Sequence, residues 1–227
     1  MRNRVEMNFE DWEPIYHEII SEFGFSQQND ELAAKILASA VSRFEFDYEE
    51  LIAKKMRKIA TICGDADSLP HHLKKFGIHG TLIAADDATS VLIREGFVPD
   101  FIVTDLDGDL PTLLQANIKG SILVVHAHGD NISKIRDWIS LFSFPIIPTV
   151  QCKPFAPLRN YGGFTDGDRA VILARSFGAK HIYLLGFDFA NPKKKIGKDI
   201  NIKLQKLAWA RRLIFDLNPP GFCLSIP

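Results

Sequence analysis

Three aspartates stand at alternate positions just after an apolar run: Asp105, Asp107 and Asp109, in the sequence TDLDGD. In an extended chain, residues two apart point to the same side and lie roughly 6.5 to 7 Å apart. Two carboxylates placed in this way can share a divalent cation, and Mg²⁺ is usually bound by one or two carboxylates together with substrate phosphates. The spacing therefore favours a magnesium and polyphosphate site, although Asp and Gly after a strand are also ordinary turn residues.

A second polar set closes the next apolar run, in the sequence VVHAHGDN from Val124 to Asn131. His126 and His128 alternate in the same manner, and Asp130 continues the alternation. Two histidines with a carboxylate can hold a transition metal, whereas Asp130 alone would join Asp105 and Asp107 around Mg²⁺. We favour the second arrangement, with the histidines as neighbouring groups, substrate contacts or a general base. Asp109 precedes Leu110-Pro111 and is expected to cap the following helix.

Two glycine-containing turns are candidate ligand contacts. The first, CGDADSLP from Cys63 to Pro70, joins a predicted strand to a helix whose N-terminus could receive a phosphate. It matches neither GxxxxGK[ST] nor GxGxxG, and a simple helix cap at Asp67 or Ser68 explains it equally well. The candidates from this turn and from the end of the next strand are Gly64, Asp65, Ser68 and Asp86.

The second turn is NYGGFTDGDR, from Asn160 to Arg169. Thr165 with Asp168 three residues later predicts a capping box, which explains those two residues without a ligand. Gly162 and Gly163 would allow a ligand to approach the backbone closely. Asp166 and Arg169 are candidates for contacts to a ribose, a pterin-like ring or a phosphate.

The elements that must position these residues begin at residue 58, where strand-like runs alternate with helix-like runs. This alternation predicts an α/β fold, a mostly parallel Rossmann-like sheet with helices on both faces. Ligands of such sheets bind outside the carboxyl ends of the strands, where the candidate residues gather. The predicted strands are 59–63, 81–85, 101–104, 122–126, 145–150, 181–187 and an edge strand at 222–226; the predicted helices between and after them are 69–76, 88–95, 110–117, 132–141, 168–177 and 204–217.

The first 57 residues carry apolar stripes at helical spacing, over residues 8–24, 32–44 and 48–56. Asn29-Asp30 is the expected cap of the second stripe. We interpret residues 1–57 as an N-terminal helical appendage and residues 58–227 as the α/β catalytic domain.

Composition narrows the function further. A net charge of -1 argues against a broad nucleic-acid surface. The run Lys193, Lys194, Lys195 is expected to be a solvated loop, with phosphate steering as the alternative. The cysteines are widely spaced and form no CxxC pair, which fits a reducing cytoplasm. No stretch approaches the roughly 20 apolar residues that span a bilayer, so we expect a cytoplasmic protein without a membrane partner.

Taken together, the motifs resemble the archaeal 6-hydroxymethyl-7,8-dihydropterin diphosphokinases, the MptE-like family. The resemblance covers roughly residues 59–190 and rests on the first glycine turn, AADDATSVLIREGFVPDFIVTDLDGD, VVHAHGDN and GGFTDGDRAVILARSFGAKHIYLLGFDF. More distantly, Pro99 to Gly108 is similar to the PDxIxGDxDS segment of the thiamin diphosphokinase catalytic domain. Two departures stand out. The first turn is more acidic than the GxGPSL-like turn of many members, and DLDG lacks the serine of the thiamin enzymes, which favours the pterin branch.

The resemblance implies Mg²⁺-dependent transfer of diphosphate from ATP, the co-substrate, to the hydroxymethyl group of a reduced pterin, with release of AMP. It matches Asp105, Asp107 and Asp130 to metal-binding acids, and the turns at 64–68 and 162–169 to nucleotide and acceptor contacts. A homodimer is expected by family analogy only. The alternatives are a thiamin diphosphokinase, a glycosyltransferase that uses Asp105-Leu106-Asp107 as a DxD motif, and a nucleotide-binding module without turnover.

Overall fold

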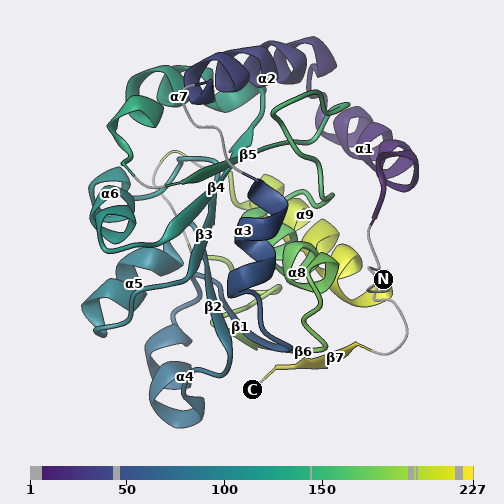
Figure 1. Cartoon of the computed structure of the whole chain (residues 1–227). Helices are drawn as coiled ribbons and strands as arrows, with labels where there is room; N and C mark the ends of the chain where they lie inside the picture. The colour runs from purple at the N-terminus through teal and green to yellow at the C-terminus, as the bar shows by residue number, and fades with distance from the viewer. Residues whose placement is uncertain are drawn as a thin grey trace.

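The computed structural model describes residues 7–42, 47–143, 145–193, 197, 199–217 and 222–226. Lys194, Lys195 and the predicted helical residues 43 and 44 lie outside this part of the chain. Within it, seven strands form one sheet in the order β5-β4-β3-β2-β1-β6-β7, and every neighbouring pair is parallel (Figure 1). The strands are β1 (Ile59–Cys63), β2 (Thr81–Ala85), β3 (Phe101–Thr104), β4 (Ile122–Ala127), β5 (Ile146–Val150), β6 (His181–Leu185) and β7 (Cys223–Ser225).

The sheet is covered on both faces, which confirms the predicted fold class. Every residue of β2, β3, β4 and β5 is buried, as expected of parallel strands packed on both sides. On one face lie α4 (Leu69–Phe76), α5 (Ala88–Arg94), α6 (Leu110–Ile118) and α7 (Ile132–Trp138). The other face carries α3 (Tyr48–Lys55) and α8 (Asp166–Ser176), and α8 crosses β1, β2 and β3 (Figure 1).

The order of the strands reverses between β1 and β6, where β6 pairs with β1 on the side opposite β2. A Cβ added to Gly64, just after β1, would lie 2.6 Å from the carbonyl oxygen of Gly186. A Cβ on Gly186, just after β6, would lie equally close to the carbonyl oxygen of Gly64, at 2.6 Å. The two loops can meet only because both residues are glycine. Gly186 has φ 68 and directly follows β6, so that the strand ends two residues before its predicted limit at residue 187.

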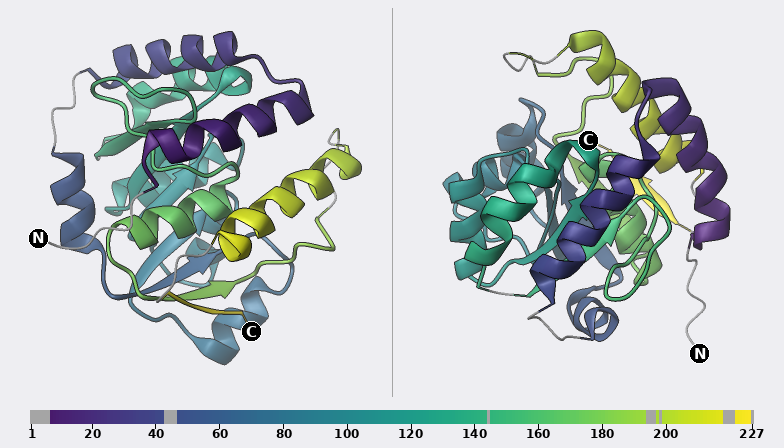
Figure 2. Two further views of the ribbon diagram at one scale, coloured as in Figure 1. Left: turned by 90° about the vertical axis from the view of Figure 1, so that its right-hand side faces the viewer. Right: turned by 90° about the horizontal axis from the view of Figure 1, so that it is seen from above.

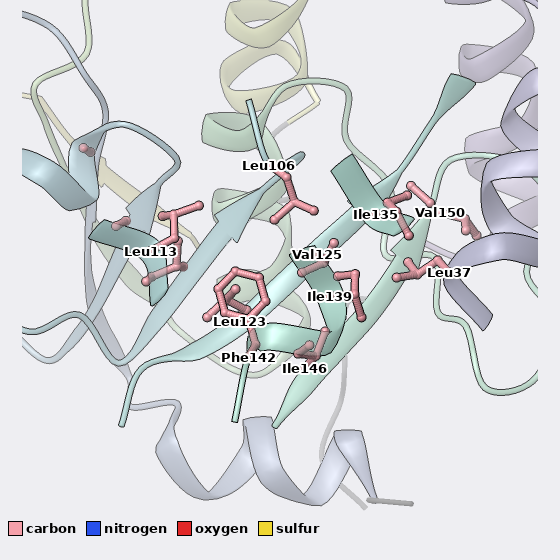
Figure 3. Packing of buried hydrophobic residues seen from close by; sticks show 14 of the residues in the cluster. Leu37, Leu106, Leu113, Leu123, Val125, Ile135, Ile139, Phe142, Ile146 and Val150 are labelled. Carbon is pink, nitrogen blue, oxygen red and sulfur yellow. The ribbon is translucent and has the colours of Figure 1, made fainter. Parts of the chain in front are cut away.

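The N-terminal helices share the hydrophobic core of the sheet. Figure 3 shows Leu37 of α2 (Gln27–Val41) beside Ile135 of α7 and Val150 of β5, within one buried cluster. Helix α1 (Phe9–Phe23) lies against α9 (Ile200–Arg211), where Trp209 Nε1 donates to Glu22 over 2.8 Å (Figure 2). The proposed boundary between residues 57 and 58 stays a prediction.

The limits of β4, β5 and β7 differ from the prediction by one residue at one or both ends, and the other differences concern helix limits. Helix α2 begins at Gln27, and the Ser26 side chain accepts from the backbone N–H of Asn29 over 3.3 Å. The predicted Asn29-Asp30 cap is therefore wrong, because Asp30 lies inside the first turn and is buried. The last helix starts at Ile200 instead of Leu204. The short helical turns are η1 (Gly129–Asn131), η2 (Ile139–Leu141) and η3 (Arg212–Asp216), the last of them π-helical.

Two further observations concern membrane-spanning helices and the state of the cysteines. No helix in the described ranges combines the length and the apolar character needed to cross a membrane. All three cysteines are free, with Cys63 and Cys152 buried and Cys223 exposed.

Candidate active site

The chain leaves β3 through a tight turn, not an extended segment. Leu106 has φ 66, in the left-handed region, and its side chain is fully buried in the core. Its N–H donates to the Thr104 hydroxyl over 2.8 Å. The expected alternation of Asp105, Asp107 and Asp109 along an extended chain is therefore wrong, because the left-handed residue turns the backbone between the first two. Such a conformation costs on the order of 1 kcal/mol or more for a residue with a side chain.

The structure brings together three acids from three different segments: Asp86, Asp105 and Asp166. One carboxylate oxygen from each lies within 4.8 Å of the other two. They follow β2, follow β3 and open α8, respectively. Oxygen ligands of an octahedral Mg²⁺ lie about 2.0 to 2.1 Å from the ion, hence about 3 to 4 Å from one another. Small side-chain adjustments would therefore close this acid cluster around a cation.

The charges within the acid cluster are only partly balanced by the protein. Burial opposes ionisation of Asp105, but the hydrogen bond from His128, the Asp107 N–H and the charge of Lys134 lower its pKa to about 2. Burial, followed by the charges of Asp105 and Asp86, raises the pKa of Asp166 well above its usual value. Like charges this close disfavour simultaneous ionisation, so the hard oxygen donors fit a divalent cation that would neutralise them.

His128 holds Asp105 in place through a defined tautomer. Its Nδ1 accepts from the backbone N–H of Asp130 over 3.3 Å, so the hydrogen-bond network places the ring proton on Nε2. Nε2 lies 3.2 Å from Asp105 Oδ2 and therefore donates to the carboxylate. Asn131 adds a bond of 2.8 Å from its amide to the Asp105 carbonyl oxygen. Asp105 is thus oriented from both its side chain and its backbone.

The other acids of the two predicted motifs have separate surroundings. Asp107 is exposed, and Lys134 Nζ lies 2.6 Å from its Oδ1. Asp130 is exposed within η1, where the extended chain has ended. Asp109 stands at the predicted N-cap position of α6, but its side chain makes no cap bond to the helix backbone and accepts from the Thr112 hydroxyl over 2.5 Å. The assignment of Asp107 and Asp130 as metal ligands stays a prediction.

A hollow of about 360 Å³ adjoins the acid cluster on the β1 and β2 side. It is bridged by Lys193, whose Nζ lies 2.9 Å from Asp65 and 3.4 Å from Asp67. Ser68 occupies the N-cap position of α4 but makes no side-chain cap bond. The hollow is lined by Asp65, Asp67, Pro70, Asp87, Ser90, Val91, Arg94 and Lys193.

Gly108 joins this hollow to the acid cluster. A Cβ on Gly108 would lie 2.6 Å from a carboxylate oxygen of Asp86 and 2.6 Å from one of Asp87. Asp86 belongs to the cluster and Asp87 to the wall of the hollow. The absence of a side chain at Gly108 therefore lets the two acids converge on the turn after β3.

On the opposite side of the cluster, the turn before α8 packs closely on protein groups. The predicted capping box of Thr165 and Asp168 is confirmed. Gly162 and Gly163 have φ 85 and 97. A Cβ on Gly162 would lie 2.7 Å from the Met7 sulfur, and one on Gly163 would lie 2.7 Å from Arg169 Cγ. These glycines allow contacts with α8 and with the residues before α1; their contact with a ligand stays a prediction.

Sequence reasoning missed a buried polar chain behind this turn. Asp30 accepts from the Tyr16 hydroxyl, the Gly129 N–H and Gln151 Nε2, each over 2.8 Å. Gln151 Oε1 in turn accepts from Arg169 Nη2 over 3.2 Å. One signal in the sequence could have revealed it: Asp30 stands at helical spacing on the same stripe as residues 33, 34, 37 and 41, all buried.

The sheet order and the cluster at its carboxyl edge define a Rossmann-like α/β protein with a candidate cation and phosphate site. Residues 35–194 match the family model described as 6-hydroxymethylpterin diphosphokinase MptE-like. The chain belongs to this family, as its sequence motifs indicated.

Three relatives extend the match over nearly the whole chain, and each is named 6-hydroxymethyl-7,8-dihydropterin pyrophosphokinase. The protein from Pyrococcus furiosus is 41% identical, covering 95% of this chain and 96% of the relative. The one from Methanothermobacter thermautotrophicus is 37% identical, covering 95% and 97%. The one from Methanocaldococcus jannaschii is 35% identical, covering 92% and 95%.

Proposed function

We propose that this protein transfers the diphosphoryl group of ATP to the hydroxymethyl group of 6-hydroxymethyl-7,8-dihydropterin and releases AMP, in the biosynthesis of a pterin cofactor. The observation that carries the proposal is the 35 to 41% identity to three pyrophosphokinases of that name over almost their full length. In the reaction the acceptor oxygen bonds to the β-phosphorus. The bond from that phosphorus to the α,β-bridging oxygen breaks, and the hydroxyl proton is released.

Asp86, Asp105 and Asp166 would hold Mg²⁺, because the acid cluster offers three hard oxygen donors with unbalanced charge. Bound Mg²⁺ would neutralise charge on the phosphate oxygens and on the leaving AMP. His128 would keep the Asp105 carboxylate in the required orientation through its Nε2 proton. Since positioning and electrostatics supply most of the catalysis in phosphoryl transfer, a strong base is not required. Asp107 and Asp130 remain sequence-derived candidates on the same loops.

The nucleotide would lie on the β1 and β2 side of the acid cluster. The hollow there has a size within the usual range for ligand sites, roughly 300 to 1,000 Å³, and it carries the cations Lys193 and Arg94. Lys193 pairs with Asp65 and Asp67 without ligand. A polyphosphate would compete for that lysine. Gly64 and Ser68 lie on the loop that leads into the hollow.

The test is incubation with ATP, MgCl₂ and 6-hydroxymethyl-7,8-dihydropterin, with AMP and the pterin diphosphate quantified by chromatography. We expect equal amounts of both products, and none in excess EDTA. Formation of ADP without acceptor, or no AMP with any pterin, would contradict the proposal. Turnover with thiamin alone would assign the related branch, and preferential binding of a nucleotide sugar over ATP would favour a glycosyltransferase.

Two finer points belong to the same proposal. The reaction would take place in the cytoplasm, where ATP is available and the three free cysteines stay reduced. Family analogy alone suggests a homodimer, which light scattering coupled to gel filtration would measure directly.

A further inference from the structure

His126 carries a buried hydrogen-bond acceptor that the protein leaves unused. The side chain is 2% exposed, and its Nε2 has no hydrogen-bond partner among the described residues. The Thr149 hydroxyl donates to the Val125 carbonyl over 3.0 Å, so its oxygen can only accept from His126 Nδ1, 3.2 Å away. The network therefore places the ring proton on Nδ1 and leaves the lone pair of Nε2 free.

Burial of such an atom without a donor costs free energy, because the atom loses its hydrogen bond to water and gains none in the protein. Desolvation, together with the nearby charge of Arg169, lowers the pKa of His126 well below its usual value, although a polar contact with the Gln151 side chain acts in the opposite direction. The ring therefore stays neutral and keeps its free acceptor at neutral pH. An unsatisfied buried group of this kind is uncommon in native proteins and is explained if a ligand supplies the donor.

Arg169 offers complementary donors beside this acceptor. Its side chain is 7% exposed and makes both of its hydrogen bonds through Nη2, to Gln151 Oε1 and to the Phe164 carbonyl, each over 3.2 Å. Within the described residues, Nε and Nη1 have no hydrogen-bond partner. The orientation of the guanidinium is fixed from behind, because Gln151 is itself held by Asp30.

We propose that His126 Nε2 and the free guanidinium nitrogens of Arg169 recognise the 2-amino-4-oxopyrimidine edge of the pterin acceptor. That edge presents two kinds of donor, the 2-amino group and N3–H, next to one acceptor, the 4-oxo oxygen. The protein presents one acceptor, which can receive one of these donors, and adjacent donors for the oxo oxygen. The inference rests on the proposed function and adds the residues that select the acceptor.

The position of His126 suits this role. The rings of His126 and His128 are near-parallel, with centroids 6.1 Å apart, and His128 contacts Asp105 of the acid cluster. A pterin whose pyrimidine edge meets His126 would direct its hydroxymethyl group toward the cluster. His126 and Thr149 belong to β4 and β5, on the side of the cluster away from the hollow beside β1 and β2. Donor and acceptor would thus approach the cation from opposite sides.

Entry of the pterin requires the segment from Gly162 to Thr165 to move. Arg169 donates to the Phe164 carbonyl of this segment, and Gly163 packs directly on the Arg169 side chain. The two glycines with positive φ supply the conformational freedom for such a movement.

The experiment compares His126→Asn with His126→Gln by steady-state kinetics and by fluorescence titration with 6-hydroxymethylpterin. Asparagine can keep a donor to Thr149 but has no atom at the position of Nε2, whereas glutamine can place its amide oxygen there. We expect His126→Asn to raise the KM for the pterin and the Kd for 6-hydroxymethylpterin about ten-fold or more, since one neutral hydrogen bond is lost. The KM for ATP should not change, and His126→Gln should restore part of the loss.

Failure of the inference and failure of the proposed function give different results. If the unaltered enzyme produces AMP and His126→Asn keeps its KM for the pterin, the role of His126 is overturned while the function stands. If the unaltered enzyme neither binds a pterin nor produces AMP, the function itself fails. Should the variants not fold, ¹⁵N NMR of the unaltered enzyme decides: saturation with the pterin should shift the unprotonated Nε2 resonance of His126, and an unchanged resonance would overturn the inference.

Discussion

Asp30 and Asp166 show two opposite ways in which this protein holds a carboxylate. Asp30 is 2% exposed and receives hydrogen bonds from a hydroxyl, a backbone N–H and an amide. The Asp166 carboxylate makes no hydrogen bond or ion pair within the described part of the chain and faces the carboxylates of Asp86 and Asp105, whose effect on its pKa the charges of Arg169 and Lys203 oppose without cancelling. A carboxylate surrounded by donors stabilises the fold, whereas one surrounded by carboxylates requires a proton or a cation. Asp30, whose hydrogen bonds are complete, is therefore structural, whereas Asp166, which lacks them, indicates where a ligand belongs.

The two histidines of β4 and its following turn repeat this contrast. His128 has both ring nitrogens bonded, one to the Asp130 N–H and one to Asp105. His126 has only Nδ1 bonded, to Thr149. Their tautomers are opposite although they lie two residues apart. From the sequence, the two histidines are equivalent candidates for a base. The hydrogen bonds give His128 a positioning role and leave Nε2 of His126 available to a substrate.

The strongest test of the contrast is Asp105→Asn, which removes one charge from the acid cluster. We expect kcat/KM for diphosphate transfer to fall about 10³-fold, as for loss of a main electrostatic contact in a transition state. Asp109→Asn is the matched control, because Asp109 is exposed on the same turn and outside the cluster. It should stay within about three-fold of the unaltered enzyme. Equal activity of the two variants in a coupled AMP assay would contradict the assignment of the cluster.

Replacement of Asp30, the structural carboxylate, should mainly reduce the stability of the fold. Asp30→Asn replaces an acceptor of three hydrogen bonds by an amide that cannot accept all of them, and the free energy of unfolding should fall by about 2 to 3 kcal/mol. Urea denaturation followed by circular dichroism measures the change. Glu31→Gln, the next and exposed residue of α2, should stay within about 0.5 kcal/mol. A stable Asp30→Asn protein would mean that the buried chain from Tyr16 to Arg169 contributes little to folding.

The smallest expected effect is a dependence of folding stability on pH, measured in the presence of EDTA. Because the folded-state pKa of Asp166 is raised, the unfolded chain loses this proton first, and stability contributed by Asp166 should fall as pH rises above about 4. The stability contributed by Asp105 changes with pH in the opposite direction. Its folded-state pKa is about 2, so its contribution is present above about pH 4 and is lost as pH falls toward 2.

Melting temperatures of the unaltered protein and of Asp166→Asn, measured in EDTA from pH 4 to 8, separate the two effects. The decrease with rising pH should be weaker in the variant. Addition of Mg²⁺ should stabilise the unaltered protein toward the upper end of this range and should affect the variant less. The same pH profile in both proteins would show that Asp166 is not crowded by charge.

The local sequence pattern was sufficient to predict most of the fold. The apolar run from Phe101 to Thr104 and the Gly-containing turns set the limits of strands and helices to within a few residues. The capping box at Thr165 and Asp168 was also readable, because its bonds join residues three apart. The predicted cap at Asp30 is wrong because a carboxylate near a helix start has the same sequence signature whether it points to its own backbone or into the core.

The sequence alone determined the parallel α/β class and the gathering of acids at strand ends, because both follow from composition and spacing within single segments. The family was indicated by the resemblance of its motifs to those of known members. Only the tertiary structure decided which acids meet. Leu106 turns the chain away from the extended form, and α8 crosses three strands to bring Asp166 beside Asp86 and Asp105. Packing of elements distant in sequence, which no local spacing encodes, selects the members of the cluster and leaves the buried Nε2 of His126 without a hydrogen-bond partner among the described residues.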